Sequence, residues 1–206
     1  MRRGVTDTDL GVSGPERELE RRLALVTPVD SMRGMFFRSV LEVVRALGDE
    51  AAVECCLEEC GERRFVEFTC YPTSNFLRLL WTAARLLGDG YGDFGGALRA
   101  LGRRGATDFF ASATGRPLQG MLAGEPSKLL GSLPMAYAVA SANGGQCSVK
   151  WDGPRMAFVR FDRDFLPCPY MEGAMAAALD VVGVREARVK GRLMGPLASE
   201  YALTWE

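Results

Sequence analysis

The sequence has no histidine among its 206 residues. Imidazole is the usual general base near neutral pH and the commonest metal-binding side chain. Its absence excludes a self-contained Ser-His-Asp or Cys-His hydrolase, a histidine-bearing zinc catalyst and a haem protein with a histidine ligand. We therefore expect a non-enzymatic protein with no catalytic residue, no metal site and no cofactor.

Long apolar runs and runs of one charge sign are also missing. No apolar stretch approaches the roughly 20 residues that span a bilayer, and the amino terminus lacks the apolar stretch of a secretory signal. The formal net charge is -1, from 25 basic and 26 acidic residues that are spread along the chain. This balance gives no electrostatic footprint for nucleic acid or anionic membrane. The sequence thus predicts a cytoplasmic protein without a membrane span or a nucleic-acid partner.

What is present is enough apolar material for one sizeable core, since 48% of the residues are hydrophobic. Residues 1–15 are polar and rich in Gly, Thr and Asp, which predicts a flexible tail. We expect one domain over residues 16–206.

The first two-thirds of the chain has the apolar periodicity of helices. Predicted helices cover about 16–26, 33–47, a cysteine-bearing stretch around 53–60, 73–87, 93–109 and a segment that begins at 126. Asp93 is a candidate N-cap, and the glycines at 102 and 105 would let another helix approach closely.

From residue 144 the apolar pattern alternates instead, which is typical of strands. The pattern predicts a hairpin over 147–161, a helix from Pro169 to Val182, and strands over 187–193 and 201–205. The fold class is therefore α+β: a helical N-terminal two-thirds packed with a C-terminal antiparallel sheet in the order strand-strand-helix-strand-strand.

The cysteines allow two interpretations. Val53, Cys56 and Cys60 lie on one helical stripe, so the two thiols are expected to be small core residues in their reduced form. The alternative is a soft-metal or redox cluster of Cys55, Cys56 and Cys60, because ligands at i and i+4 can share one metal. Zinc would still require a fourth donor.

Three other motifs each allow a functional and a structural interpretation. The G-x-G-x-x-G match over 90–95 follows a predicted helix where a phosphate-binding loop needs a strand, so a helix-to-helix turn is favoured. The charge alternation around Asp162 and Asp164, near Glu172, favours a solvated loop over a paired-carboxylate site. Arg116 follows a glycine at an expected helix end and is a candidate for a ligand carboxylate or phosphate, or for a structural C-cap contact.

Several short motifs recur in a recognisable order along the chain. They are Arg33-Gly34-Met35-Phe36-Phe37, Tyr71-Pro72, Leu101-Gly102, Thr114-Gly115-Arg116, Pro126 with Lys128-Leu129-Leu130, Pro134 with Tyr137, and Pro169-Tyr170 with Gly173. Their order over residues 16–206 resembles a myxobacteria-restricted family of uncharacterised proteins of about this length.

The layout of that family is similar to haem-NO-binding sensors and to vinyl-reductase-type small-molecule domains. In the haem sensors a histidine ligates iron, and no residue here can match it. In the vinyl-reductase-type relatives a pocket between helices and sheet receives small aromatic or lipid-like molecules. The resemblance implies a pocket of this kind, for which the candidate residues are Phe109, Phe110, Arg116, Met121, Tyr137 and Phe158. The apolar members would equally fill an ordinary core.

Three functions follow as hypotheses. The first is a regulatory or sensory domain that binds a small apolar, aromatic or acyl ligand between helices and sheet. The second is an interaction module with a solid core and a protein partner. The third is an enzyme or redox sensor that uses Cys55, Cys56 or Cys60, and a haem site with a Cys or Tyr ligand is a lesser variant.

Overall fold

The computed structural model describes residues 14–122, 124–142 and 145–206. Its N-terminal part is helical, with α1 (Gly14–Leu23), α2 (Gly34–Leu47), α3 (Glu50–Cys60), α4 (Thr73–Leu87), the 3-10 turn η1 (Gly88–Tyr91), α5 (Phe94–Ala111), α6 (Gly115–Leu122) and α7 (Pro126–Ala140). Helix α1 begins at Gly14, two residues before the predicted start. Residues 1–13, most of the expected tail, lie outside the described residues.

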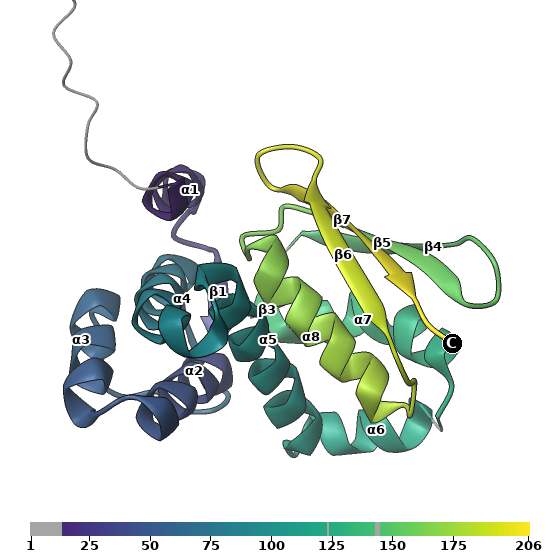
Figure 1. The fold of residues 1–206 in the computed structure, drawn as a ribbon, viewed down its shortest axis with the longest axis horizontal. Coiled ribbons are helices and arrows are strands. Elements are labelled where there is room, and N and C mark those ends of the chain that lie inside the picture. Colours follow the sequence, from purple (N-terminus) through teal and green to yellow (C-terminus); the bar gives the residue numbers. More distant parts are fainter. Residues whose placement is uncertain (1–13, 123, 143–144) are drawn as a thin grey trace, which may run out of the picture.

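The C-terminal part contains β4 (Gln146–Trp151), β5 (Met156–Asp162), α8 (Cys168–Val181), β6 (Arg188–Leu193) and β7 (Ala198–Thr204). The four strands form an antiparallel sheet in the order β4-β5-β7-β6. The predicted fold class and the strand-strand-helix-strand-strand order are confirmed. In Figure 1 the helices α1 to α4 lie on one side of the molecule and the sheet on the other, with α5 and α8 between them.

The sequence did not predict a second, smaller sheet. Three antiparallel strands form it in the order β2-β1-β3: β1 (Ser31–Arg33), β2 (Cys70–Pro72) and β3 (Ser141–Ala142). Each has only two or three residues, too few to show an alternating pattern. Strand β1 leads into α2, β2 leads into α4, and β3 follows α7, so the small sheet brings these three helix ends together.

Local sequence explains several helix boundaries. The carboxylate of Asp93 accepts a hydrogen bond from the Gly96 amide and so caps α5, as predicted. Gly61 ends α3 with a φ of 76°, a left-handed conformation that glycine adopts without steric cost. The G-x-G-x-x-G match runs from η1 into the start of α5, and the element directly before η1 is helix α4 instead of a strand.

Helices α5 and α8 cross with their backbones in close approach. A Cβ atom on Gly102 would lie 1.9 Å from the Tyr170 carbonyl oxygen, and one on Gly173 would lie 1.9 Å from the Arg99 carbonyl oxygen. Each helix thus presents a glycine to the backbone of the other. We call this pair of contacts the glycine crossing. It confirms the expectation that Gly102 admits a neighbouring helix.

The inner face of the large sheet packs on helices. Ala157, Val159 and Phe161 of β5 alternate as buried residues, and Tyr201 and Leu203 of β7 lie beside them. Helix α8 packs under β6 and α7 under β4. None of the helices in the described part of the chain has the length and apolarity that a bilayer span requires.

Candidate functional site

An apolar cavity of about 120 Å³ lies where the helical N-terminal part meets the C-terminal part, which contains the large sheet. We call these two parts the N-terminal and the C-terminal half. Helices α2, α5, α7 and α8 contribute to its wall, together with β1, β5 and the loop before α8. Its wall has six aromatic side chains, Phe36, Phe109, Phe110, Tyr137, Phe161 and Tyr170. Among the described residues, no charged side chain and no thiol lines it.

Most of these aromatic rings contact one another in two groups. Phe36 of α2 stacks on Phe109 of α5 with 6.5 Å between ring centroids, and Tyr137 of α7 contacts Phe161 of β5 at 4.9 Å. Alanines on α5, α7 and α8 complete the lining. A methyl group at these positions leaves volume that a larger apolar residue would fill, and this explains why the helices and the sheet pack here without closing the space.

The cavity brings together half of the predicted ligand-binding residues. Phe109, Phe110 and Tyr137 line it. Arg116 instead lies exposed on α6 and donates a hydrogen bond from Nε to the Ala111 carbonyl oxygen at 2.7 Å, a local structural contact. Met121 is 73% exposed. Phe158 lies on the opposite face of the sheet from Phe161, because strand neighbours an odd number of positions apart point to opposite faces.

Sequence reasoning did not include Met32, Phe36, Phe161 or Tyr170 among the lining residues. Phe36 belonged to a predicted helix and Phe161 to a predicted strand, so both were expected to be apolar and buried. The sequence did not show that both residues lie at the contact between the two halves. Periodicity predicts the buried face of each element, but it does not predict which faces pack against each other.

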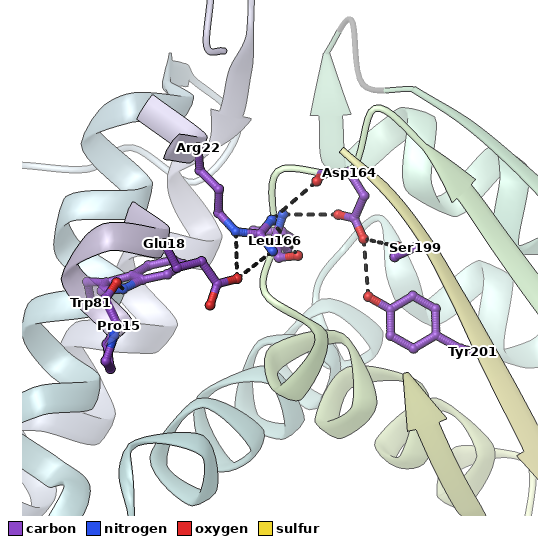
Figure 2. Close-up of polar contacts among 8 residues, drawn as sticks. All are labelled: Pro15, Glu18, Arg22, Trp81, Asp164, Leu166, Ser199 and Tyr201. Atoms are coloured by element: carbon purple, nitrogen blue, oxygen red, sulfur yellow. Dashed lines mark hydrogen bonds and ion pairs between the residues drawn. The ribbon is translucent and has the colours of Figure 1, made fainter. Parts of the chain in front are cut away.

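A buried polar cluster lies next to the cavity, in the loop between β5 and α8 (Figure 2). The Asp164 carboxylate accepts hydrogen bonds from the Ser199 hydroxyl at 2.6 Å, the Tyr201 hydroxyl at 3.2 Å and the Leu166 amide at 3.0 Å. Burial raises the pKa of Asp164, although these hydrogen bonds and the nearby Arg22 oppose the shift. The side chain is only 2% exposed.

The expectation of a solvated loop is therefore wrong for Asp164. Glu172 is buried and accepts hydrogen bonds from Arg99 Nε and from the Gly191 amide, both at 2.9 Å. Asp162 alone is exposed, in an ion pair with Arg160. The two buried carboxylates are satisfied by residues that are distant in the sequence, which charge alternation within one segment cannot indicate.

Helix α1 is held to this cluster by Arg22, which is buried (Figure 2). Its guanidinium donates to the carbonyl oxygens of Asp164 at 3.3 Å and Leu166 at 3.1 Å, and it pairs with Glu18 at 2.7 Å. Leu166 also lines the cavity. The contact of α1 and the wall of the cavity therefore share one residue.

The adjacent loop residue Arg163 makes a second anchor. Its Nη2 donates to both carboxylate oxygens of Asp30, at 2.9 and 2.8 Å. Burial acts to raise the pKa of Asp30, but hydrogen bonds from Arg163 and Thr27 outweigh it and hold the pKa below its usual value. Asp30 lies just before β1. The loop between β5 and α8 is thus tied to the N-terminal half at two points.

The cysteine alternative finds little support in the geometry. Cys56 and Cys60 are buried in the core, and burial raises the pKa of Cys56 to about 12 and that of Cys60 to about 11. A thiol with a raised pKa is a poor nucleophile and metal ligand. Within the described part of the chain, no group of three or more metal-ligating side chains is placed to hold an ion.

Comparison with solved structures identifies the fold. An H-NOX protein variant from K. algicida, in its unliganded Fe(II) state, has a TM-score of 0.63 at 13% identity and covers 85% of this chain and 97% of its own. An H-NOX protein from S. oneidensis in the Fe(II)NO state has a TM-score of 0.63 at 12% identity, with coverage of 85% and 99%. At these identities the likeness concerns the fold alone, and it confirms the layout implied by the sequence resemblance.

No curated protein has a sequence that matches this chain significantly. A family model does match it. The model is described as "Protein of unknown function (DUF2378)", and it covers residues 25–206, from just after α1 through the last strand. The chain therefore belongs to the DUF2378 family.

Proposed function

We propose that this protein is a non-enzymatic sensory domain that binds a small apolar ligand in the cavity between its helices and its sheet. The observation that carries the proposal is the cavity itself, lined by six aromatic rings at the junction of the two halves. Protein interiors are close-packed, so an apolar hollow of this size between helices and sheet is a suitable place for a ligand.

The size and lining of the cavity define the class of ligand. Its volume of about 120 Å³ lies below the roughly 300–1,000 Å³ of drug-sized and cofactor sites. It is close to that of an apolar cavity of about 150 Å³ that stays dry and binds benzene or xenon. The favoured ligand is uncharged and small, such as a single aromatic ring or a short acyl chain.

A haem group does not fit this site. The volume is too small for a cofactor, and the wall holds neither a thiol nor, in a chain without histidine, an imidazole. The tyrosines Tyr137 and Tyr170 are the two oxygen donors in the wall, and burial raises the pKa of both hydroxyls. A tyrosinate ligand would require the charged form that burial disfavours.

The accessible lining of the cavity is almost wholly apolar. This favours an aromatic or aliphatic molecule over one that needs a hydrogen-bond partner. The wall offers no nucleophile with a lowered pKa and no carboxylate for acid-base chemistry. This lining supports binding without turnover.

The position of the cavity supports a sensory role. Its wall combines Met32 and Phe36 from the N-terminal half with Phe161 and Leu166 from the C-terminal half. A ligand between them would favour one relative arrangement of the halves, which is the condition for a population shift. Leu166 would pass this preference to α1, because its carbonyl oxygen accepts a hydrogen bond from Arg22.

Isothermal titration and thermal unfolding with the uncharged probes benzene, phenol and methyl butanoate test the proposal. Ala136→Leu places a larger side chain in the cavity wall of α7, and Ala138→Leu makes the same change at an exposed position of the same helix. We expect at least one probe to stabilise the wild-type protein and Ala138→Leu. A probe at 100 times its Kd contributes about 2.7 kcal/mol, which corresponds to a Tm rise of about 5–10 °C in a domain of this size.

Ala136→Leu should abolish the stabilisation while leaving the protein folded, because its methyl groups occupy the space of the ligand. Equal stabilisation of both variants would place binding elsewhere and contradict the proposal. If no probe gives heat or stabilisation, the interaction module with a solid core replaces the ligand-binding domain.

A further inference from the structure

The outer face of the large sheet has a charge pattern that differs from the rest of the chain. The side chains that point away from α7 and α8 include five basic residues, namely Lys150, Arg160, Arg188, Lys190 and Arg192, and two acidic ones, Asp162 and Glu200. The whole chain carries a formal net charge of -1. Positive charge is therefore concentrated on this face, which no helix of the described residues covers in Figure 1.

Much of that charge is uncompensated. Asp162 pairs with Arg160 at 3.2 Å, and Glu200 accepts a hydrogen bond from Arg192 Nε at 3.0 Å. Lys150, Lys190 and Arg188 are exposed and have no ion pair among the described residues. Within the described part of the chain, these three cations thus have no charged partner.

An apolar centre lies between these cations. In the strand register Lys150 faces Phe158, Phe158 faces Ala202, and Ala202 faces Lys190. This row crosses all four strands and places the two lysines about 14 Å apart, three strand spacings. Phe158 is half-buried and stacks on no other ring of the described residues. An aromatic ring surrounded by charged residues is a pattern typical of protein interfaces, which have an apolar centre and a polar rim.

We infer that this sheet face docks an acidic protein segment with an apolar residue between its carboxylates. The apolar residue would contact Phe158 and Ala202, and the carboxylates would reach Lys150 and Lys190. The lysines lie on the two edge strands, where they oppose pairing with another strand, so the partner docks on the face and does not extend the sheet. The inference does not depend on the ligand cavity.

A nucleic acid fits the face less well. The face offers one aromatic ring where single-stranded binders stack successive bases. Asp162 and Glu200 lie in its middle strands, and each would repel a phosphate backbone. A protein partner can match both signs, since it can place its own basic groups beside them.

The test uses fluorescence anisotropy with a short labelled peptide that has glutamates at both ends and leucines in the centre. Lys150→Glu/Lys190→Glu should weaken its binding at least tenfold, and Phe158→Ala by a similar factor, about 1.4 kcal/mol. Arg78→Glu/Arg85→Glu is the matched control, because it makes the same charge change at exposed positions of α4. The control should bind as the wild type does.

Three results would overturn the inference. The first is equal loss of affinity in the sheet variant and the control, which would show a general charge effect. The second is tighter, Phe158-dependent binding of oligothymidylate than of the peptide, which would assign the face to nucleic acid. The third is a wild-type dimer in sedimentation that Lys150→Glu/Lys190→Glu dissociates, because the occupant would then be a second copy of the chain.

Discussion

The glycine crossing between α5 and α8 gives the sharpest prediction for stability. In Gly102→Ala the new Cβ would lie 1.9 Å from the Tyr170 carbonyl oxygen. An ordinary contact between such atoms is about 3.4 Å, so the two backbones must separate by roughly 1.5 Å. The obstacle is a backbone atom in the first turn of α8, which cannot rotate away as a side chain would.

The expected magnitude combines two effects of opposite sign. Overpacking a close-packed contact costs up to about 3 kcal/mol, whereas alanine in place of glycine stabilises a helix by about 1 kcal/mol. We expect a net loss of about 2 kcal/mol, which lowers Tm by about 4–8 °C. Thermal and urea unfolding monitored by circular dichroism measure both quantities.

Gly131→Ala provides the matched control. Gly131 lies inside α7, and a Cβ there would meet nothing within 4 Å. The same substitution should therefore raise Tm by about 2–4 °C, since only the helix propensity changes. If Gly102→Ala also raises Tm, the two helices tolerate a wider separation and the close approach has no energetic significance.

Three further predictions concern the buried polar groups and the thiols. Arg22→Met leaves two buried carbonyl oxygens without a donor and should cost about 3 kcal/mol, whereas Glu18→Gln, which alters the partly exposed partner, should cost less than about 1 kcal/mol in the same urea titration. Because burial raises the pKa of Asp164, the native state holds that proton more tightly than the unfolded chain does, and this stabilising contribution is lost as pH rises above the ordinary carboxyl range. The Tm of the wild type relative to Asp164→Asn should accordingly fall between about pH 4 and pH 8, and a difference that is constant with pH would contradict the shift. In native protein an alkylating probe followed by mass spectrometry should label the exposed Cys70 and spare Cys56, and rapid labelling of Cys56 would reopen the redox alternative.

The helices and the hairpin could be predicted because each repeats its apolar residues over several turns or alternations. Helix α5 follows from Leu98, Leu101 and Phe109, with its start fixed by Asp93. Helix α6 was missed, since it has only eight residues and includes Pro117 and Gly120, both poor helix formers in isolation. Its formation depends on packing against α5 and α7.

The candidate site was less predictable for a related reason. Phe158 and Phe161 are both phenylalanines of β5, and the sequence alone does not show which of them faces the helices. Asp164 resembled a solvated residue because its partners Ser199 and Tyr201 come from a strand more than thirty positions later. Local patterns predict what lies on one element, whereas the cavity and the polar cluster arise from pairs of elements that are distant along the chain.

The contact of Arg22 with the β5-α8 loop also bears on the order in which this chain folds. Arg22 and Leu166 are separated by 144 positions. During synthesis, α1 emerges from the ribosome long before the carbonyl groups that its arginine binds, so its docking is among the last events and has a high loop-closure entropy. Until then the guanidinium remains hydrated and the side of α1 that carries Arg22 stays open, a state in which chaperones or an early partner would meet the nascent protein.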